Sequence, residues 1–234
     1  MATGPSRDSP VRPVPRYAAT DLSPRDFFWR FARIGAPVVL TGFWDSELAW
    51  WRDKAGKLAA CAAEEYQRLS DQYGGVSPPN CDLYNSWCKD TVQVIRSGEC
   101  QVHARLDADH IPAPLRFSSP MASIKEHLDV QFPYVLTALE GQRFGGTDHY
   151  DESCLGTFSM QYAGHKRWTF WAPWDLGTIK AHDRFETDIG PGEVVLYGPA
   201  WFHATTVLPG HGKSIAVAYY TPEVGQPMPY TMPY

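Results

Sequence analysis

The sequence predicts a mostly β protein of barrel or jelly-roll type, with helices towards its N-terminus. Short β-type runs separated by Gly, Pro and Asp turns fill the chain from Tyr134 onward, which is typical of that architecture. The strongest helix signals lie before residue 73. At 234 residues, 44% of them hydrophobic and 14% aromatic, the chain is long enough for one domain with a substantial core.

The first helix is predicted between Ser23, a typical N-cap, and Gly35, a typical C-terminal stop. Apolar side chains between them recur at helical spacing and form one face. These apolar positions are Phe27, Phe31 and Ile34. A second, mostly helical segment is predicted over residues 47–73.

The predicted strands are short, and from Tyr134 onward they follow one another closely. They cover residues 38–42, 91–95, 101–104, 134–139, 156–162, 166–172, 193–197, 205–207 and 214–220. Most of segment 74–120 is interrupted by Gly and Pro, and residues 174–188 carry no readable motif. We expect substrate-recognition residues in these two segments.

Composition divides the chain into three parts. Residues 1–20 are rich in Pro, Arg and Ser and are predicted to be a flexible N-terminal arm. Residues 21–221 are predicted to form the folded domain, and residues 222–234 a C-terminal tail. Because the N-terminus has no apolar signal-peptide core and no run reaches membrane-spanning length, we expect an intracellular protein, cytoplasmic or nuclear, that does not enter membranes.

Charge and cysteine content narrow the function classes. The net charge of −5 gives no overall basic footprint, so bulk nucleic-acid binding is not predicted, although a local basic groove is compatible with it. The five cysteines form no CxxC pair. Reduced thiols are therefore favoured over the alternatives, a zinc site or a disulfide.

His149 and Asp151 form the most informative motif, a histidine and an aspartate two positions apart. On a β-strand, that spacing directs both side chains to the same side. His203 follows a turn, an apolar strand and a Gly-Pro corner, and can supply a third ligand from a distant strand. Two imidazoles and one carboxylate on one face of a metal are the facial triad of non-haem Fe(II) oxygenases. The alternative is that His203 simply packs among aromatic residues.

Three blocks around these residues resemble the JmjC (cupin-like) 2-oxoglutarate- and Fe(II)-dependent oxygenases, the hydroxylase branch in particular. The blocks are Gly145–Glu152, Gln161–Pro173 and Pro199–His203, and the stretches Asp26–Phe28 and Ala36–Gly42 resemble the opening of that family. The resemblance runs discontinuously from about residue 22 to residue 221. It implies that residues 21–221 form a JmjC-like oxygenase domain whose fold is a double-stranded β-helix, the jelly roll of cupins, with flanking N-terminal helices.

The resemblance also implies a ligand set. His149, Asp151 and His203 would hold Fe(II), with 2-oxoglutarate as co-substrate and O2 as oxidant. Lys166, in Gly-His-Lys-Arg-Trp, matches the lysine that binds the distal carboxylate of 2-oxoglutarate, where a fixed ammonium pairs with an anion. The alternative for Lys166 is a surface lysine on a strand. Thr147 lies one place after the family's threonine and is a further candidate contact.

A second lysine competes with Lys166 for the co-substrate. Lys213 lies ten residues after His203, a spacing that resembles the prolyl-hydroxylase and phytanoyl-hydroxylase pattern. Only one lysine is needed, and the longer surrounding motif favours Lys166. Ala218 stands where some relatives carry a co-substrate-contacting asparagine, so that contact is expected to be missing.

The implied activity is hydroxylation of a C–H bond in a protein, a nucleic acid or a small molecule, with release of succinate and CO2. N-demethylation by the same iron chemistry is an alternative. Further alternatives are a non-catalytic cupin-type binding protein, which the intact ligand set disfavours, and a cupin metalloenzyme without 2-oxoglutarate. The family modifies proteins, RNA and histones, which favours a macromolecular substrate. A monomer is expected, because the C-terminal helices that make some relatives dimeric are missing.

Overall fold

The computed structural model describes residues 10–42, 52–53, 56–57, 60, 93–95, 118–119, 122–123, 134–138, 143–149, 156–212 and 214–221. One sheet has the order β1 (Val11–Pro13), β11 (Arg184–Ile189), β10 (Lys166–Trp171), β13 (Phe202–Val207) and β8 (Arg143–His149). The other has the order β2 (Arg16–Ala18), β3 (Val38–Thr41), β12 (Val194–Tyr197), β9 (Gly156–Ala163), β14 (Ser214–Thr221), β7 (Tyr134–Ala138) and β4 (Gln93–Ile95). Strands β5 (Ser118–Ser119) and β6 (Ala122–Ser123) pair separately.

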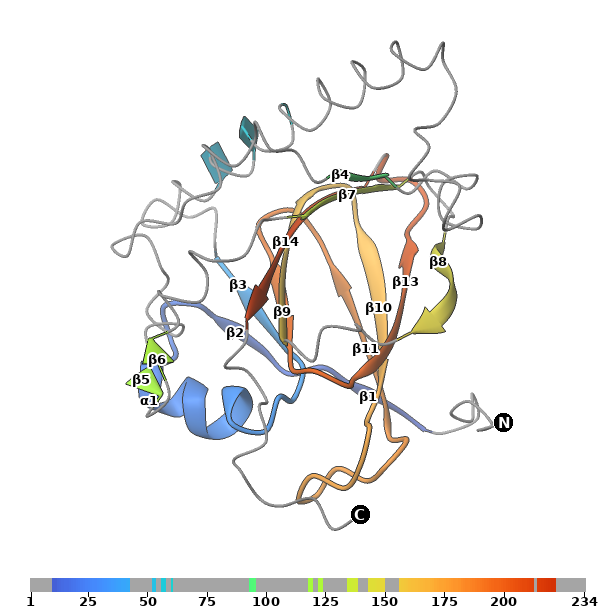
Figure 1. Cartoon of the computed structure of the whole chain (residues 1–234). Helices are drawn as coiled ribbons and strands as arrows, with labels where there is room; N and C mark the ends of the chain where they lie inside the picture. The colour runs from blue at the N-terminus through green and yellow to red at the C-terminus, as the bar shows by residue number, and fades with distance from the viewer. Residues whose placement is uncertain are drawn as a thin grey trace.

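The pairing of the strands defines a double-stranded β-helix. Strand β7 pairs with β14, β8 with β13, β9 with β12, and β10 with β11, all antiparallel. Strands β11 to β14 thus retrace strands β7 to β10, as one long antiparallel ribbon that is wound across two sheets. Figure 1 shows these strands arranged around a common interior. The predicted mostly β, jelly-roll fold is confirmed.

Alternation along the strands builds the interior. In β10, the side chains of Lys166, Trp168 and Phe170 are buried, whereas Arg167 between them is exposed. Because successive side chains of a strand point to opposite faces, the first three share the inner face. On the outer face, Arg167 forms a two-fold ion pair with Asp188 of β11 (2.7 and 2.8 Å).

The core between the two sheets is rich in aromatic residues. It contains Val14, Ala36, Val39, Trp168, Phe170, Ala172, Phe185, Ile189, Val195, Tyr197 and Trp201. Phe170 packs against Tyr197 with ring centroids 5.1 Å apart, and so joins the two sheets. Burial of such large rings is the main favourable term in holding two sheets face to face.

The predicted N-terminal helix forms as α1 (Pro24–Phe27), which continues into the π-helical turn η1 (Phe28–Ala32). The Ser23 hydroxyl accepts a hydrogen bond from the Asp26 N–H (3.1 Å), which confirms the N-cap. Gly35 has φ +65°, the left-handed conformation that ends helices. Of the described residues in segment 47–73, residues 52, 53, 56, 57 and 60 are helical.

The prediction of a flexible arm over residues 1–20 is wrong for residues 10–20. Strand β1 pairs in parallel with β11, and β2 pairs in parallel with β3. Val14 between these strands is only 2% exposed. Composition indicates that this segment cannot form a core of its own. Composition does not show that each of the two sheets has an edge strand with which the segment can pair. Residues 1–9 and the predicted tail, residues 222–234, lie outside the described residues.

Within the described part of the chain, none of the helices has the length and apolar character needed to cross a membrane.

Candidate metal centre and anion site

His149 and His203 lie side by side in the structure, although they are distant in sequence. They are Cα partners on the antiparallel strands β8 and β13, and their ring centroids are 4.4 Å apart. Directly opposed residues in such a pair project from the same face of the sheet. The register shifts just beyond this pair, where Thr205 of β13 lies opposite Phe144 of β8. The predicted meeting of the two imidazoles is thereby observed.

Hydrogen bonds orient the His203 ring, which is 3% exposed. Nδ1 lies 3.0 Å from the carbonyl oxygen of Trp201, a contact that requires Nδ1 to carry the proton. Nε2 is then the lone-pair nitrogen, and the Tyr197 hydroxyl, 3.4 Å away, donates to it weakly. A backbone carbonyl that fixes the tautomer in this way is typical of metal-binding histidines.

Three predicted site residues cannot be placed as side chains. Asp151 and Lys213 lie outside the described residues. Thr147 lies on β8, two residues before His149, and its side chain is not described. Among the residues that the structure describes, no group of three or more His, Cys, Asp or Glu side chains could hold a metal ion. The structure therefore brings together two of the three predicted metal ligands.

Lys166 begins strand β10 with its side chain inside the barrel, 1% exposed. Burial lowers the pKa of its ammonium group from 10.5 to about 8. Nζ lies 5.9 Å from the centre of the Trp168 ring, a cation–π distance. The alternative of a surface lysine is excluded, because a surface ammonium would not be desolvated.

Lys166 and His203 face the same interior space. Lys166 pairs with Val207 and Phe170 pairs with His203, so the lysine lies four residues along the β10–β13 ladder from the histidine. At the rise of a β-strand this is about 13 Å between backbones. A lysine side chain and a five-carbon dicarboxylate placed end to end are long enough to bridge that separation.

Several buried polar atoms in the barrel have no hydrogen-bond partner among the described residues. Those on inward-facing positions of the central strands are Ser159 Oγ, Gln161 Oε1, Trp168 Nε1 and Thr205 Oγ1. Ser159 faces inward because it pairs with Val195, a core residue. Buried polar groups are normally satisfied, so a cluster of unsatisfied ones indicates a missing polar ligand or water. The imidazole pair, the ammonium group and these polar atoms together fit a metal with a bound keto acid.

Sequence reasoning missed the polar lining of the barrel apart from Lys166. Strand β9 carries Thr157, Ser159 and Gln161 at every second position, all buried. A period of two in polar residues within a predicted buried strand is a recognisable signal of such a lining. Thr205 and Trp168 also lay in predicted strands, but their unpaired state depends on the assembled interior.

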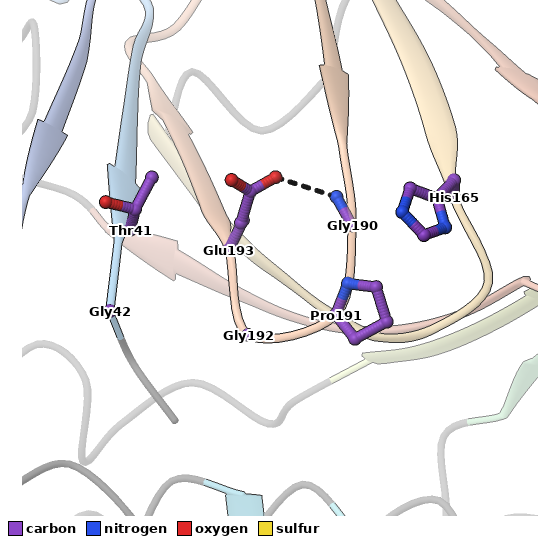
Figure 2. Close-up of a pocket in the computed structure, with 7 residues that line it drawn as sticks. All are labelled: Thr41, Gly42, His165, Gly190, Pro191, Gly192 and Glu193. Carbon is purple, nitrogen blue, oxygen red and sulfur yellow. Dashed lines mark hydrogen bonds between the residues drawn. The ribbon is translucent and has the colours of Figure 1, made fainter. Parts of the chain in front are cut away.

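A surface pocket of 360 Å³ lies at the opposite end of the strands from His203. Its lining comprises Thr41, Gly42, His165, Gly190, Pro191, Gly192 and Glu193. Figure 2 shows the Glu193 carboxylate accepting a hydrogen bond from the Gly190 N–H (2.8 Å), with His165 beyond Gly190. Neither His149 nor His203 lines this pocket, so we assign the candidate chemistry to the barrel interior instead.

Comparisons with known proteins add the following. No protein-family model matches the chain, and no curated protein matches it. Part of the chain is similar to the ribosomal oxygenase YcfD of Escherichia coli, at 18% identity and TM-score 0.29, over 39% of this chain and 24% of that one. YcfD has also been solved with cobalt and 2-oxoglutarate.

Other solved structures match a similar share of the chain. Oxalate decarboxylase OxdC of Bacillus subtilis is 13% identical at TM-score 0.33, over 40% of this chain and 22% of that one. RmlC of Streptococcus suis is 11% identical at TM-score 0.32, over 39% and 43% of the two chains. The match spans less than half the length of each of these proteins. At such identities and TM-scores, these likenesses carry no argument about activity.

Proposed function

We propose that this protein is a 2-oxoglutarate- and Fe(II)-dependent oxygenase that hydroxylates a C–H bond. The proposal depends on one observation: the His149–His203 pair and the buried Lys166 side chain lie inside the same barrel. The sequence resemblance adds Asp151 as the third ligand. The alternative, a non-catalytic interaction protein, is disfavoured because paired imidazoles and a buried ammonium share one interior.

Different residues would bind the metal and the co-substrate. His149, His203 and Asp151 would hold Fe(II), and the Trp201 carbonyl keeps the proton of His203 on Nδ1 rather than on Nε2. Lys166 would neutralise the distal carboxylate of 2-oxoglutarate in a site from which water is excluded. When bound, Fe(II) would activate O2 and 2-oxoglutarate would supply two electrons, so that one oxygen atom enters the C–H bond and the other enters succinate, with release of CO2.

Several finer assignments stay predictions. Hydroxylation is the default outcome, and N-demethylation would follow from the same step on an N-methyl group. A protein or nucleic-acid substrate, a monomeric state and an intracellular location are likewise predictions from the sequence. Thr147 and Lys213 also keep their status as candidate co-substrate contacts.

The decisive experiment measures succinate formed from 2-oxoglutarate by the full chain with Fe(II) and ascorbate. We expect turnover in the wild type and a loss of at least about 100-fold in His203→Ala and Asp151→Ala, because each removes a metal ligand. His211→Ala serves as the matched control, since that histidine is exposed and lies outside the segments in which substrate recognition is expected. Turnover that survives Asp151→Ala would contradict the facial triad.

Binding measurements, rather than turnover, distinguish the roles of Lys166 and Lys213. Lys166→Met should weaken 2-oxoglutarate binding to the Mn(II)-loaded chain, because it removes the cation that pairs with the distal carboxylate. Lys213→Met should leave the dissociation constant within about two-fold, which is the scatter expected for a residue outside the site. The opposite result would transfer the co-substrate role to Lys213.

A further inference from the structure

We infer that Trp168 Nε1–H and Thr205 Oγ1–H are ligand donors that bind the same carboxylate as Lys166. This inference rests on the proposed function and deepens it, because it assigns the co-substrate's distal end to two residues that the sequence motif did not indicate. Both residues would determine the specificity of the site for a dicarboxylate over a monocarboxylate.

Strand register places the two donors together. Trp168 and Thr205 are Cα partners on β10 and β13, and both side chains are buried at 3% exposure. The pair lies one same-face step from His203 towards the Lys166–Val207 pair. Along the ladder, these two residues therefore occupy the position between the proposed metal and the proposed ammonium.

The Trp168 ring contacts both ends of this space. Its centroid is 5.8 Å from that of the His203 ring and 5.9 Å from Nζ of Lys166. Its flat stacking on Phe170 (interplanar angle 10°, centroids 5.6 Å apart) holds the ring in place. A carboxylate held by the ammonium would therefore lie near the Trp168 ring, whose partner across the ladder is Thr205.

The unsatisfied state of both donors is the physical reason for assigning them to a ligand. Neither Trp168 Nε1 nor Thr205 Oγ1 has a hydrogen-bond partner among the described residues, although each atom is fully buried. A buried donor that is left unpaired destabilises the folded chain, and a charged acceptor would relieve that penalty more strongly than a neutral one. Donors that stay unpaired in the ligand-free chain therefore lower its stability, and they raise its affinity for a ligand that pairs with them.

The chain provides matched controls for both positions. Trp171 lies on the same strand as Trp168, and its Nε1 is also buried without a partner among the described residues, but it projects from the opposite face. Thr206 adjoins Thr205 and likewise projects from the opposite face of β13. Trp171→Phe and Thr206→Val thus repeat each chemical change outside the proposed carboxylate site.

The experiment combines calorimetric titration of the Mn(II)-loaded full chain with thermal unfolding of the metal-free chain. Two ligands are compared: 2-oxoglutarate, and 2-oxopentanoate, which has the same chain length but no distal carboxylate. For Thr205→Val we expect 2-oxoglutarate binding to weaken about ten-fold or more, 2-oxopentanoate binding to stay within about two-fold, and Tm to rise by a few degrees. Trp168→Phe should show the same ligand selectivity, and the two control variants should bind both ligands as the wild type does.

Each other outcome has a definite meaning. Unchanged 2-oxoglutarate binding in Thr205→Val, or equal weakening of both ligands, overturns the carboxylate contact. A fall in Tm of Thr205→Val shows that the hydroxyl has a structural partner, such as an ordered water, and also overturns it. If the wild type binds neither keto acid, the proposed function itself fails, which is distinguishable because no variant is then needed.

Discussion

At the scale of single residues, Lys166 is a costly side chain to bury. Its pKa of about 8, against 10.5 in the unfolded chain, corresponds to about 3 kcal/mol of destabilisation of the charged form. Strong desolvation of a titratable group inside a barrel is typical of a functional site rather than a structural one. Its charged form therefore destabilises the fold, and a bound anion would offset part of that cost.

The lowered pKa of Lys166 predicts a pH dependence of binding. The ammonium is charged below about pH 8 and becomes neutral above it. The dissociation constant for 2-oxoglutarate should therefore increase as the pH rises through about 8, approaching about ten-fold per pH unit, and titration calorimetry from about pH 6.5 to 9.5 measures it. Lys166→Met is the control, because it should bind weakly at every pH. A wild-type profile that is flat across this range would contradict the assignment.

The stability of the fold should also depend on the titration of Lys166, but it should rise with pH where ligand binding weakens. Because the folded-state pKa of Lys166 is lower than that of the unfolded chain, the unfolded state binds up to one more proton between about pH 8 and 10.5. As the pH rises through that window, this residue alone should increase the free energy of unfolding by up to about 3 kcal/mol. Urea unfolding should show that the difference in free energy of unfolding between the wild type and Lys166→Met narrows as the pH rises.

At the scale of elements, sequence signals were reliable where they act locally. The helix after Ser23 and the strand Val38–Thr41 form as predicted, because caps, helical spacing and β-branched runs act within a few residues. Strand β11 was missed, since its Arg-Phe-Glu-Thr-Asp-Ile sequence is half charged. Its alternation of inward Phe185, Thr187 and Ile189 with polar residues is the signal that would have found it.

The helix cap gives an element-scale prediction. Ser23→Ala removes the hydroxyl that accepts from the Asp26 N–H, and should lower the free energy of unfolding by about 1 kcal/mol. Ser23→Asp, which restores an acceptor, should recover most of that loss. Chemical denaturation measures both. An Ala variant as stable as the wild type would mean that packing of Phe27 alone holds the helix.

At the scale of the whole molecule, the N-terminal segment ties the two sheets together. Strand β1 extends the sheet of β11, and β2 extends the sheet of β3. Side chains reinforce both connections, since Arg12 pairs with Asp183 and Arg16 with Glu193. Residues 10–20, which precede the predicted domain, therefore belong to the folded unit.

Deleting residues 1–18 should consequently destabilise the fold. The deletion exposes two sheet edges and removes Val14 from the core, so we expect Tm to fall by several degrees. Deleting residues 1–9 retains all of these contacts and serves as the control. Equal Tm values for the two deletions would show that β1 and β2 contribute nothing to stability.

Local sequence was enough to predict the mostly β architecture and the helix cap, and it indicated His149, Lys166 and His203 as candidate site residues. These depend on local periodicity, turn residues and the ligand types in the motifs around His149, Lys166 and His203. The folded chain was needed to show that the rings of His149 and His203 lie 4.4 Å apart between centroids, and that Lys166 is buried enough to lower its pKa. Pairing partners, burial and unsatisfied donors such as Thr205 Oγ1 arise from contacts between distant segments, and no local pattern encodes them.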